Sequence, residues 1–168
     1  MKIIIMQGLP GSGKSTWIKE NHPNAVVCSA DHYFTDPKTG EYKFNPAEIG
    51  EAHEACFRSF LDCLNTRDGF AVATYNDIVV DNTNLSLWEM YPYISVALVH
   101  GYPVEVVRIC ADPEVCASRN VHGVPRETIL RMAGRMEKPL KFWECSFREV
   151  QYYRGVGYVN EKGEVDKV

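Results

Sequence analysis

The chain has 168 residues, of which 45% are hydrophobic and 24% charged, and its formal net charge is −4. This size and composition predict one globular domain with a hydrophobic core, and the acidic balance excludes a protein that coats nucleic acid through charge alone. The six cysteines show no zinc-site spacing and no apolar stretch approaches the roughly 20 residues that span a membrane, so we expect a cytoplasmic protein without a structural metal or a membrane segment.

The chain begins with a continuous apolar run, which GLPGSGKST follows directly at residues 8–16. The run predicts a strand over residues 2–7 that is buried on both faces of a parallel sheet. The segment after it fits the phosphate-binding pattern G-x-x-x-x-G-K-[ST] and precedes a helix that is expected to end near residue 20. We expect Lys14 to lie along the β- and γ-phosphates and Ser15 to bind Mg²⁺. The predicted nucleotide-binding residues of this loop are Gly8, Gly11, Ser12, Gly13, Lys14, Ser15 and Thr16.

Asp31 follows the second predicted strand, which covers residues 25–29. Ligands of open parallel sheets collect beyond the carboxyl ends of the strands. Asp31 is therefore placed to accept the proton of a hydroxyl group that attacks the γ-phosphate. The alternative is that Asp31 caps a helix, although Ser29 is an equally good candidate for that role.

The next part of the chain continues the alternation of strands and helices. Residues 35–44 are polar and predict an exposed loop, and the Asn45-Pro46-Ala47-Glu48 cap starts a helix that ends near Asn65. His53 falls on the apolar face of this helix and is interpreted as a core residue. The further expected elements are a strand at 78–81, a helix over 85–100 that Pro92 interrupts, a strand at 103–109 and a helix opened by Asp112. This order predicts a three-layer α/β fold with a central parallel sheet.

Asp81 ends the third predicted strand after three apolar residues. An acid in this position can hold Mg²⁺ directly or through water. The alternative is an N-cap role, which the neighbouring Asn82, Thr83 and Asn84 can also fill. Asp81 and Ser15 are thus the predicted metal-binding residues.

Basic residues gather after the fourth strand, where seven of them stand against three acids between Arg119 and Arg148. We expect a helical lid over about residues 119–138, with Arg119 and Arg126 close to the bound phosphates. The alternative is that both are surface arginines at helix ends. A last helix is expected over about 140–153, so that the main domain covers residues 1–154. Residues 155–168 are expected to be a tail, either disordered or a small hairpin around residues 161–163.

Four segments together resemble the phage-type polynucleotide 5′-hydroxyl kinases and, more widely, the AAA-type kinase and zeta-toxin group. These segments are GLPGSGKSTW, SADHYF, DNTN and SRNVHGVPRETILRM, in matching order over residues 1–138. The resemblance implies a P-loop kinase fold in which Asp31 is the general base and Arg119 is the lid arginine that touches the phosphates. It also assigns a substrate role to the triplet Asp81, Thr83 and Asn84.

The sequence departs from this family on the acceptor side. Phe34 stands where the phage kinases carry an arginine that helps to hold the acceptor phosphate. A second lid arginine is also absent, with His122 near its place. Phe34 is therefore a candidate substrate residue whose identity bears on the acceptor.

The sequence predicts an enzyme that uses ATP and Mg²⁺ to phosphorylate a hydroxyl group, with Lys14, Asp31 and Arg119 as its catalytic residues. The first expected acceptor is the 5′-hydroxyl end of a nucleic acid, either DNA or RNA. A small metabolite or a nucleoside is the second, and a nucleotide-dependent ATPase or switch module is a third reading. The sequence predicts no oligomeric state.

Overall fold

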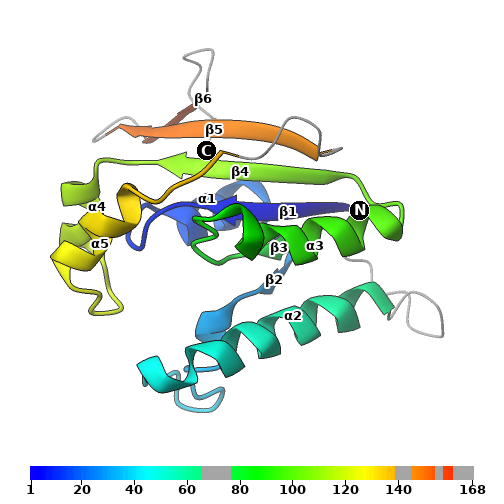
Figure 1. Ribbon diagram of the computed structural model, residues 1–168, viewed down its shortest axis with the longest axis horizontal. Helices are drawn as coiled ribbons and strands as arrows, with labels where there is room; N and C mark the ends of the chain where they lie inside the picture. Colours follow the sequence, from blue (N-terminus) through cyan, green and yellow to red (C-terminus); the bar gives the residue numbers. More distant parts are fainter. Residues whose placement is uncertain (66–76, 139–144, 154–156, 161–168) are drawn as a thin grey trace.

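The computed structural model describes residues 1–65, 77–138, 145–153 and 157–160. Up to residue 138 its strands and helices follow the predicted alternation (Figure 1). The elements in chain order are β1 Lys2–Gln7, α1 Lys14–Asn21, β2 Val26–Cys28, the 3₁₀ turns η1 Ala30–His32 and η2 Pro46–Glu48, α2 Ile49–Asn65, β3 Asp77–Val80, α3 Leu87–Val99, β4 Val104–Cys110, α4 Pro113–Arg119, α5 Arg126–Ala133, β5 Cys145–Tyr153 and β6 Gly157–Asn160.

In the described part of the chain these strands form one sheet in the order β2-β3-β1-β4-β5-β6. The first five strands are parallel, and β6 runs antiparallel to β5. The central position of β1 explains its unbroken apolar sequence, because both of its faces are covered. Ile3 and Ile5 pack with α2 and α3 on one face, and Ile4 and Met6 pack with α1 on the other. The predicted three-layer α/β fold with a parallel sheet is confirmed.

The carboxyl ends of β1 and β4 point to the edge of the sheet where α4 and α5 lie side by side (Figure 1). The loop after β1, the turn after β2 and the segment after β3 meet at this same edge. The strand-end rule therefore holds for the elements that carry the candidate residues. No helix in the described ranges combines the length and the apolarity that crossing a membrane requires.

The helix predicted over 140–153 is wrong, because residues 145–153 form strand β5, while residues 139–144 lie outside the described part. Two charged residues of this strand pair with residues of β4. Arg148 contacts Glu105 at 3.0 Å, and Glu149 contacts Arg108 at 3.1 Å. Tertiary pairing thus overrides local propensity here. The hairpin expected around residues 161–163 lies outside the described residues, whereas β6 pairs with β5.

A buried polar network fixes the end of the lid to the central strands. Arg108 of β4 is 6% exposed and donates to Gln7 Oε1 at 2.7 Å and to the Glu137 carbonyl at 2.5 Å. Gln7 Nε2 donates to the carbonyls of Asn84 and Glu137, both at 2.8 Å. Each buried polar group in this cluster thus has a partner, as the cost of burying an unpaired one requires.

Candidate active site

The phosphate-binding loop adopts a conformation that its glycines permit. Gly11 has φ +76° and Gly13 has φ +100°, the left-handed region that side chains with a Cβ disfavour. A Cβ on Gly11 would lie 2.2 Å from the main-chain carbonyl oxygen of Cys116 in α4. The loop and helix α4 therefore touch through backbone atoms.

Replacing Gly11 by alanine is expected to weaken ATP binding at least about tenfold, because left-handed backbone costs an L-residue roughly 1–2 kcal/mol before the contact with Cys116 is counted. Isothermal titration calorimetry measures this affinity. Gly50→Ala is the matched control, since a Cβ there meets nothing within 4 Å. Equal ATP affinities of the two variants would show that this loop does not hold the nucleotide.

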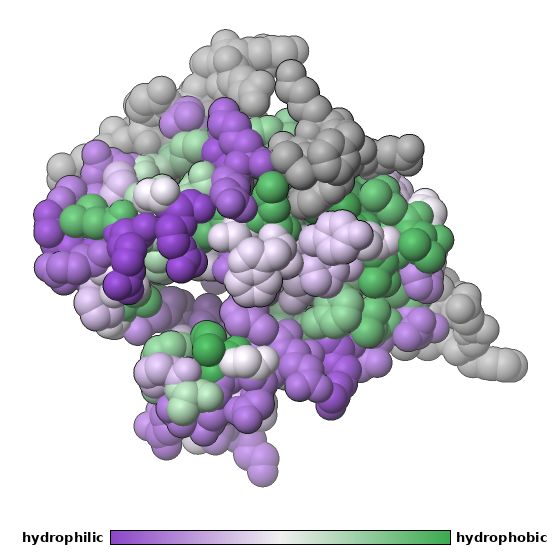
Figure 2. All heavy atoms as spheres, viewed as in Figure 1, coloured by the Kyte–Doolittle hydropathy of each residue, from purple (hydrophilic) through white to green (hydrophobic). Residues whose placement is uncertain are grey.

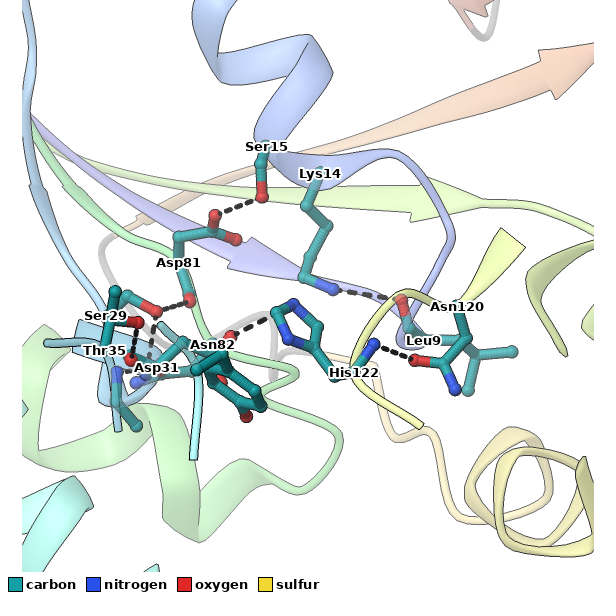
Figure 3. A network of polar contacts seen from close by, with 12 residues as sticks. Leu9, Lys14, Ser15, Ser29, Asp31, Thr35, Asp81, Asn82, Asn120 and His122 are labelled. Carbon is teal, nitrogen blue, oxygen red and sulfur yellow. Dashed lines mark hydrogen bonds and ion pairs between the residues drawn. The ribbon is translucent and has the colours of Figure 1, made fainter. Parts of the chain in front are cut away.

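Lys14 folds back across the loop, where its Nζ donates to the carbonyls of Gly8 at 3.1 Å and Leu9 at 3.0 Å (Figure 3). Burial lowers the pKa of Lys14, and the negative charges of Asp81 and Asp31 partly oppose that effect. A phosphate group in this loop would add negative charge beside the ammonium group. The loop and its lysine thus fit the phosphates of a nucleotide.

Ser15 and Asp81 come together as the sequence predicts. Ser15 Oγ donates to Asp81 Oδ2 at 2.7 Å. The N-cap alternative for Asp81 is wrong, because Ser86 caps α3 instead. Hydroxyl and carboxylate oxygens are ligands that Mg²⁺ prefers, and Mg²⁺ is bound by few protein groups together with phosphates. These two residues therefore fit the ion.

The carboxylate of Asp31 faces the cavity from the other side. Ser29 is the N-cap of the turn η1, since its Oγ accepts from the Asp31 N–H at 3.3 Å, and the same hydroxyl donates to the Asp81 carbonyl at 2.9 Å. The capping alternative for Asp31 is therefore wrong. Its side chain is half exposed and contacts Tyr42 and His122.

One cavity of about 920 Å³ brings these groups together beneath the lid. Figure 2 shows its mouth as a hollow between the lid and the start of α2. The predicted residues that line it are Gly11, Gly13, Lys14, Ser15, Thr16, Asp31, Asp81, Thr83 and Arg119. Gly8 and Ser12 also belong to the loop, but both residues are buried. A volume of this size is typical of small-molecule and cofactor sites.

Besides Gly8 and Ser12, three further predicted site residues are not among the described residues that line this cavity. Phe34 is 5% exposed and belongs to the core cluster that includes residues of α2. Asn84 is 2% exposed, and its Nδ2 donates to the Met6 carbonyl at 2.8 Å, which makes it a support for β1. Arg126 pairs through Nε and Nη2 with Glu114 and thereby braces α5 against α4.

The cavity also contains side chains that sequence reasoning missed. Tyr42 and Phe44 line it from the predicted exposed loop, and His122 lines it from the lid. His53 is exposed to the cavity rather than placed in the core, which corrects its interpretation. The sequence did offer a signal for Tyr42 and Phe44. They are two aromatic residues on either side of a lysine in an otherwise polar loop.

The fold and the loop together define a P-loop protein, whose phosphate-binding loop fits the phosphates of a nucleotide. Residues 3–139 match the family model described as AAA domain, and the chain belongs to that family. Over 137 residues it is 35% identical to NEDD4-binding protein 2 of Homo sapiens, covering 77% of this chain and 7% of that protein. The chain thus spans only a small part of this relative's length.

Solved structures share the fold at lower identity. The structure of AvrRxo1-ORF1:-ORF2 with ATP has a TM-score of 0.61 and 18% identity, covering 95% of this chain and 57% of that chain. The Mycobacterium tuberculosis APS kinase CysC in complex with AMPPNP and APS has a TM-score of 0.54 and 18% identity, covering 92% and 90%. At these identities the likeness shows a shared fold and no more.

Proposed function

We propose that this protein is a Mg²⁺- and ATP-dependent kinase that phosphorylates the 5′-hydroxyl end of DNA or RNA. The observation that carries the transfer reaction is the carboxylate of Asp31, which lines the same cavity as Lys14 and Ser15. An alcohol must lose a proton as it attacks phosphorus, and a carboxylate on the acceptor side can take it. The four-segment resemblance to the polynucleotide 5′-hydroxyl kinases favours a nucleic-acid end as the acceptor.

The residues divide into a donor half and an acceptor half. In the donor half, the loop N–H groups and Lys14 hold the phosphates of ATP, and Ser15 and Asp81 hold Mg²⁺, which neutralises phosphate charge when it is bound. In the acceptor half, Asp31 takes the proton of the attacking hydroxyl. The oxygen forms a bond to the γ-phosphorus as the bond to the β–γ bridging oxygen breaks and ADP leaves. Arg119 stabilises the charge on the transferring group.

A nucleoside or another small alcohol is the second candidate acceptor. Tyr42, Phe44 and Ile49 give the acceptor side of the cavity an apolar and aromatic wall. The position that carries a phosphate-holding arginine in the phage kinases is a buried phenylalanine here. Both features favour an acceptor that brings a ring and little charge.

An acceptor screen with γ-labelled ATP and Mg²⁺ tests the proposal. We expect label on a 5′-hydroxyl oligonucleotide and none on the same oligonucleotide with a 5′-phosphate, the matched control. The Michaelis constant for the oligonucleotide should rise about sevenfold between about 50 and 200 mM salt for two phosphate contacts, whereas that of a neutral nucleoside should not change. Label on nucleosides alone would favour the second candidate. ADP release that needs no acceptor would instead indicate an ATPase or a switch module, and it would overturn the proposal that the protein is a kinase.

A further inference from the structure

The loop over residues 35–44 is closed by its own backbone. Thr35 and Tyr42 form an antiparallel bridge, and the Asp36 N–H donates to the Glu41 carbonyl at 2.9 Å. The Lys43 N–H donates to the Phe34 carbonyl at 2.8 Å. Since Thr35 Oγ1 also donates to the Asp31 carbonyl at 2.7 Å, the loop starts and ends beside Asp31.

Phe34 fixes this loop to the core. Its ring packs edge-on against Phe44 at 5.1 Å and against Tyr42 at 6.2 Å, measured between ring centroids. Aromatic pairs of this geometry contribute beyond their buried area, at roughly 0.5–1.5 kcal/mol each. The phenylalanine three residues after Asp31 therefore holds the aromatic side chains that face the cavity.

Two side chains from different elements contact the Asp31 carboxylate. The Tyr42 hydroxyl donates to Oδ1 at 2.9 Å. His122 Nε2 of the lid lies 3.8 Å from Oδ2 (Figure 3). The rings of Tyr42 and His122 are 4.6 Å apart. Burial raises the pKa of Tyr42, and the charge of Asp31 and the hydrogen bond to it raise it further, so the hydroxyl stays a donor at neutral pH.

We propose that Tyr42 is a positioning residue for Asp31, holding Oδ1 so that Oδ2 is presented to the acceptor hydroxyl. The role rests on the proposed function, because it requires Asp31 to be the base. The terminal torsion of an aspartate is broad, so a carboxylate without a fixed partner samples many orientations. Transfer requires the reacting atoms to be aligned, and a misplacement of about 1 Å can cost on the order of 10²-fold in rate. Phe34 thus serves the acceptor side indirectly, through the loop that carries Tyr42.

Tyr42→Phe in the full chain tests this role, since it removes the hydroxyl and keeps the ring that packs on Phe34. We expect kcat for label transfer to fall about 10- to 10²-fold. The Michaelis constant for ATP should stay within about twofold of wild type and the melting temperature within about 4 °C. Tyr33→Phe is the matched control, a neighbouring tyrosine that is 45% exposed, and it should transfer at the wild-type rate. In an Asp31→Asn background, Tyr42→Phe should cause no further loss.

Each other outcome overturns the role. Wild-type transfer by Tyr42→Phe, with Asp31→Asn inactive, overturns the positioning role and leaves the proposed function intact. A further loss in the Asp31→Asn background shows that Tyr42 acts independently of Asp31. A matching fall in ATP affinity and melting temperature shows a structural role. Absence of transfer by the wild-type protein to any acceptor overturns the proposed function, and the positioning role with it.

Discussion

Asp31→Asn is expected to reduce phosphate transfer to a hydroxyl acceptor by about 10²- to 10⁴-fold, the usual contribution of a positioned general base. Asparagine has nearly the same shape and can still accept from the Tyr42 hydroxyl through its amide oxygen. It cannot take a proton from the acceptor, so chemistry is lost while the local structure stays. Single-turnover label transfer measures the rate, and calorimetry measures ATP affinity, which should not change.

Asp62→Asn is the control for this variant. Asp62 is an exposed acid on α2 and is not among the described residues that line the cavity. Its transfer rate should equal that of wild type. Normal turnover by Asp31→Asn would contradict the base assignment, and a parallel loss of ATP affinity would mean that Asp31 supports the nucleotide site instead.

Arg108→Ala is expected to lower the free energy of unfolding by about 3 kcal/mol, the lower end of the cost of breaking a buried ion pair. The substitution leaves Gln7 Oε1 and the Glu137 carbonyl without their guanidinium donor. We expect the lower end of this range because Glu149 is partly exposed. After the substitution it still pairs with Lys138, whose Nζ lies 3.4 Å from Glu149 Oε1. Urea unfolding followed by circular dichroism gives this free energy.

Arg58→Ala is the matched control, because Arg58 pairs with Glu54 on the exposed surface of α2. Exposed pairs of this spacing contribute about 0.5 kcal/mol or less. A loss for Arg108→Ala no larger than that of Arg58→Ala would mean that the buried network does not stabilise the lid end.

The donor half of the site could be predicted from the sequence because its chemistry is local. The strand, the glycines and Lys14 follow one another in the chain, and their spacing alone requires the geometry that the structure shows. Asp31 and Asp81 were reached by one further rule, that parallel strands end at a common edge. Both carboxylates line the cavity for this reason.

The acceptor half could not be predicted in the same way, because contacts between distant segments determine it. Tyr42 reaches Asp31 only because the loop turns back on itself, and His122 reaches it only from the lid. Arg126 was expected close to the bound phosphates from its place in the predicted lid, yet Glu114 on the preceding helix engages it. The helix expected at 140–153 failed likewise, since the partners of Arg148 and Glu149 lie on β4.

The attachment of the lid has a mechanical consequence. The segment 111–136 leaves the sheet at the end of β4, and the buried network around Arg108 and Gln7 holds residue 137 close to the same edge. A segment that is attached to the sheet at both ends cannot move away from it as a whole. We therefore expect any opening of this segment to be a rotation about its two attachment points, and Gln7, the residue that immediately precedes the phosphate-binding loop, holds one of them.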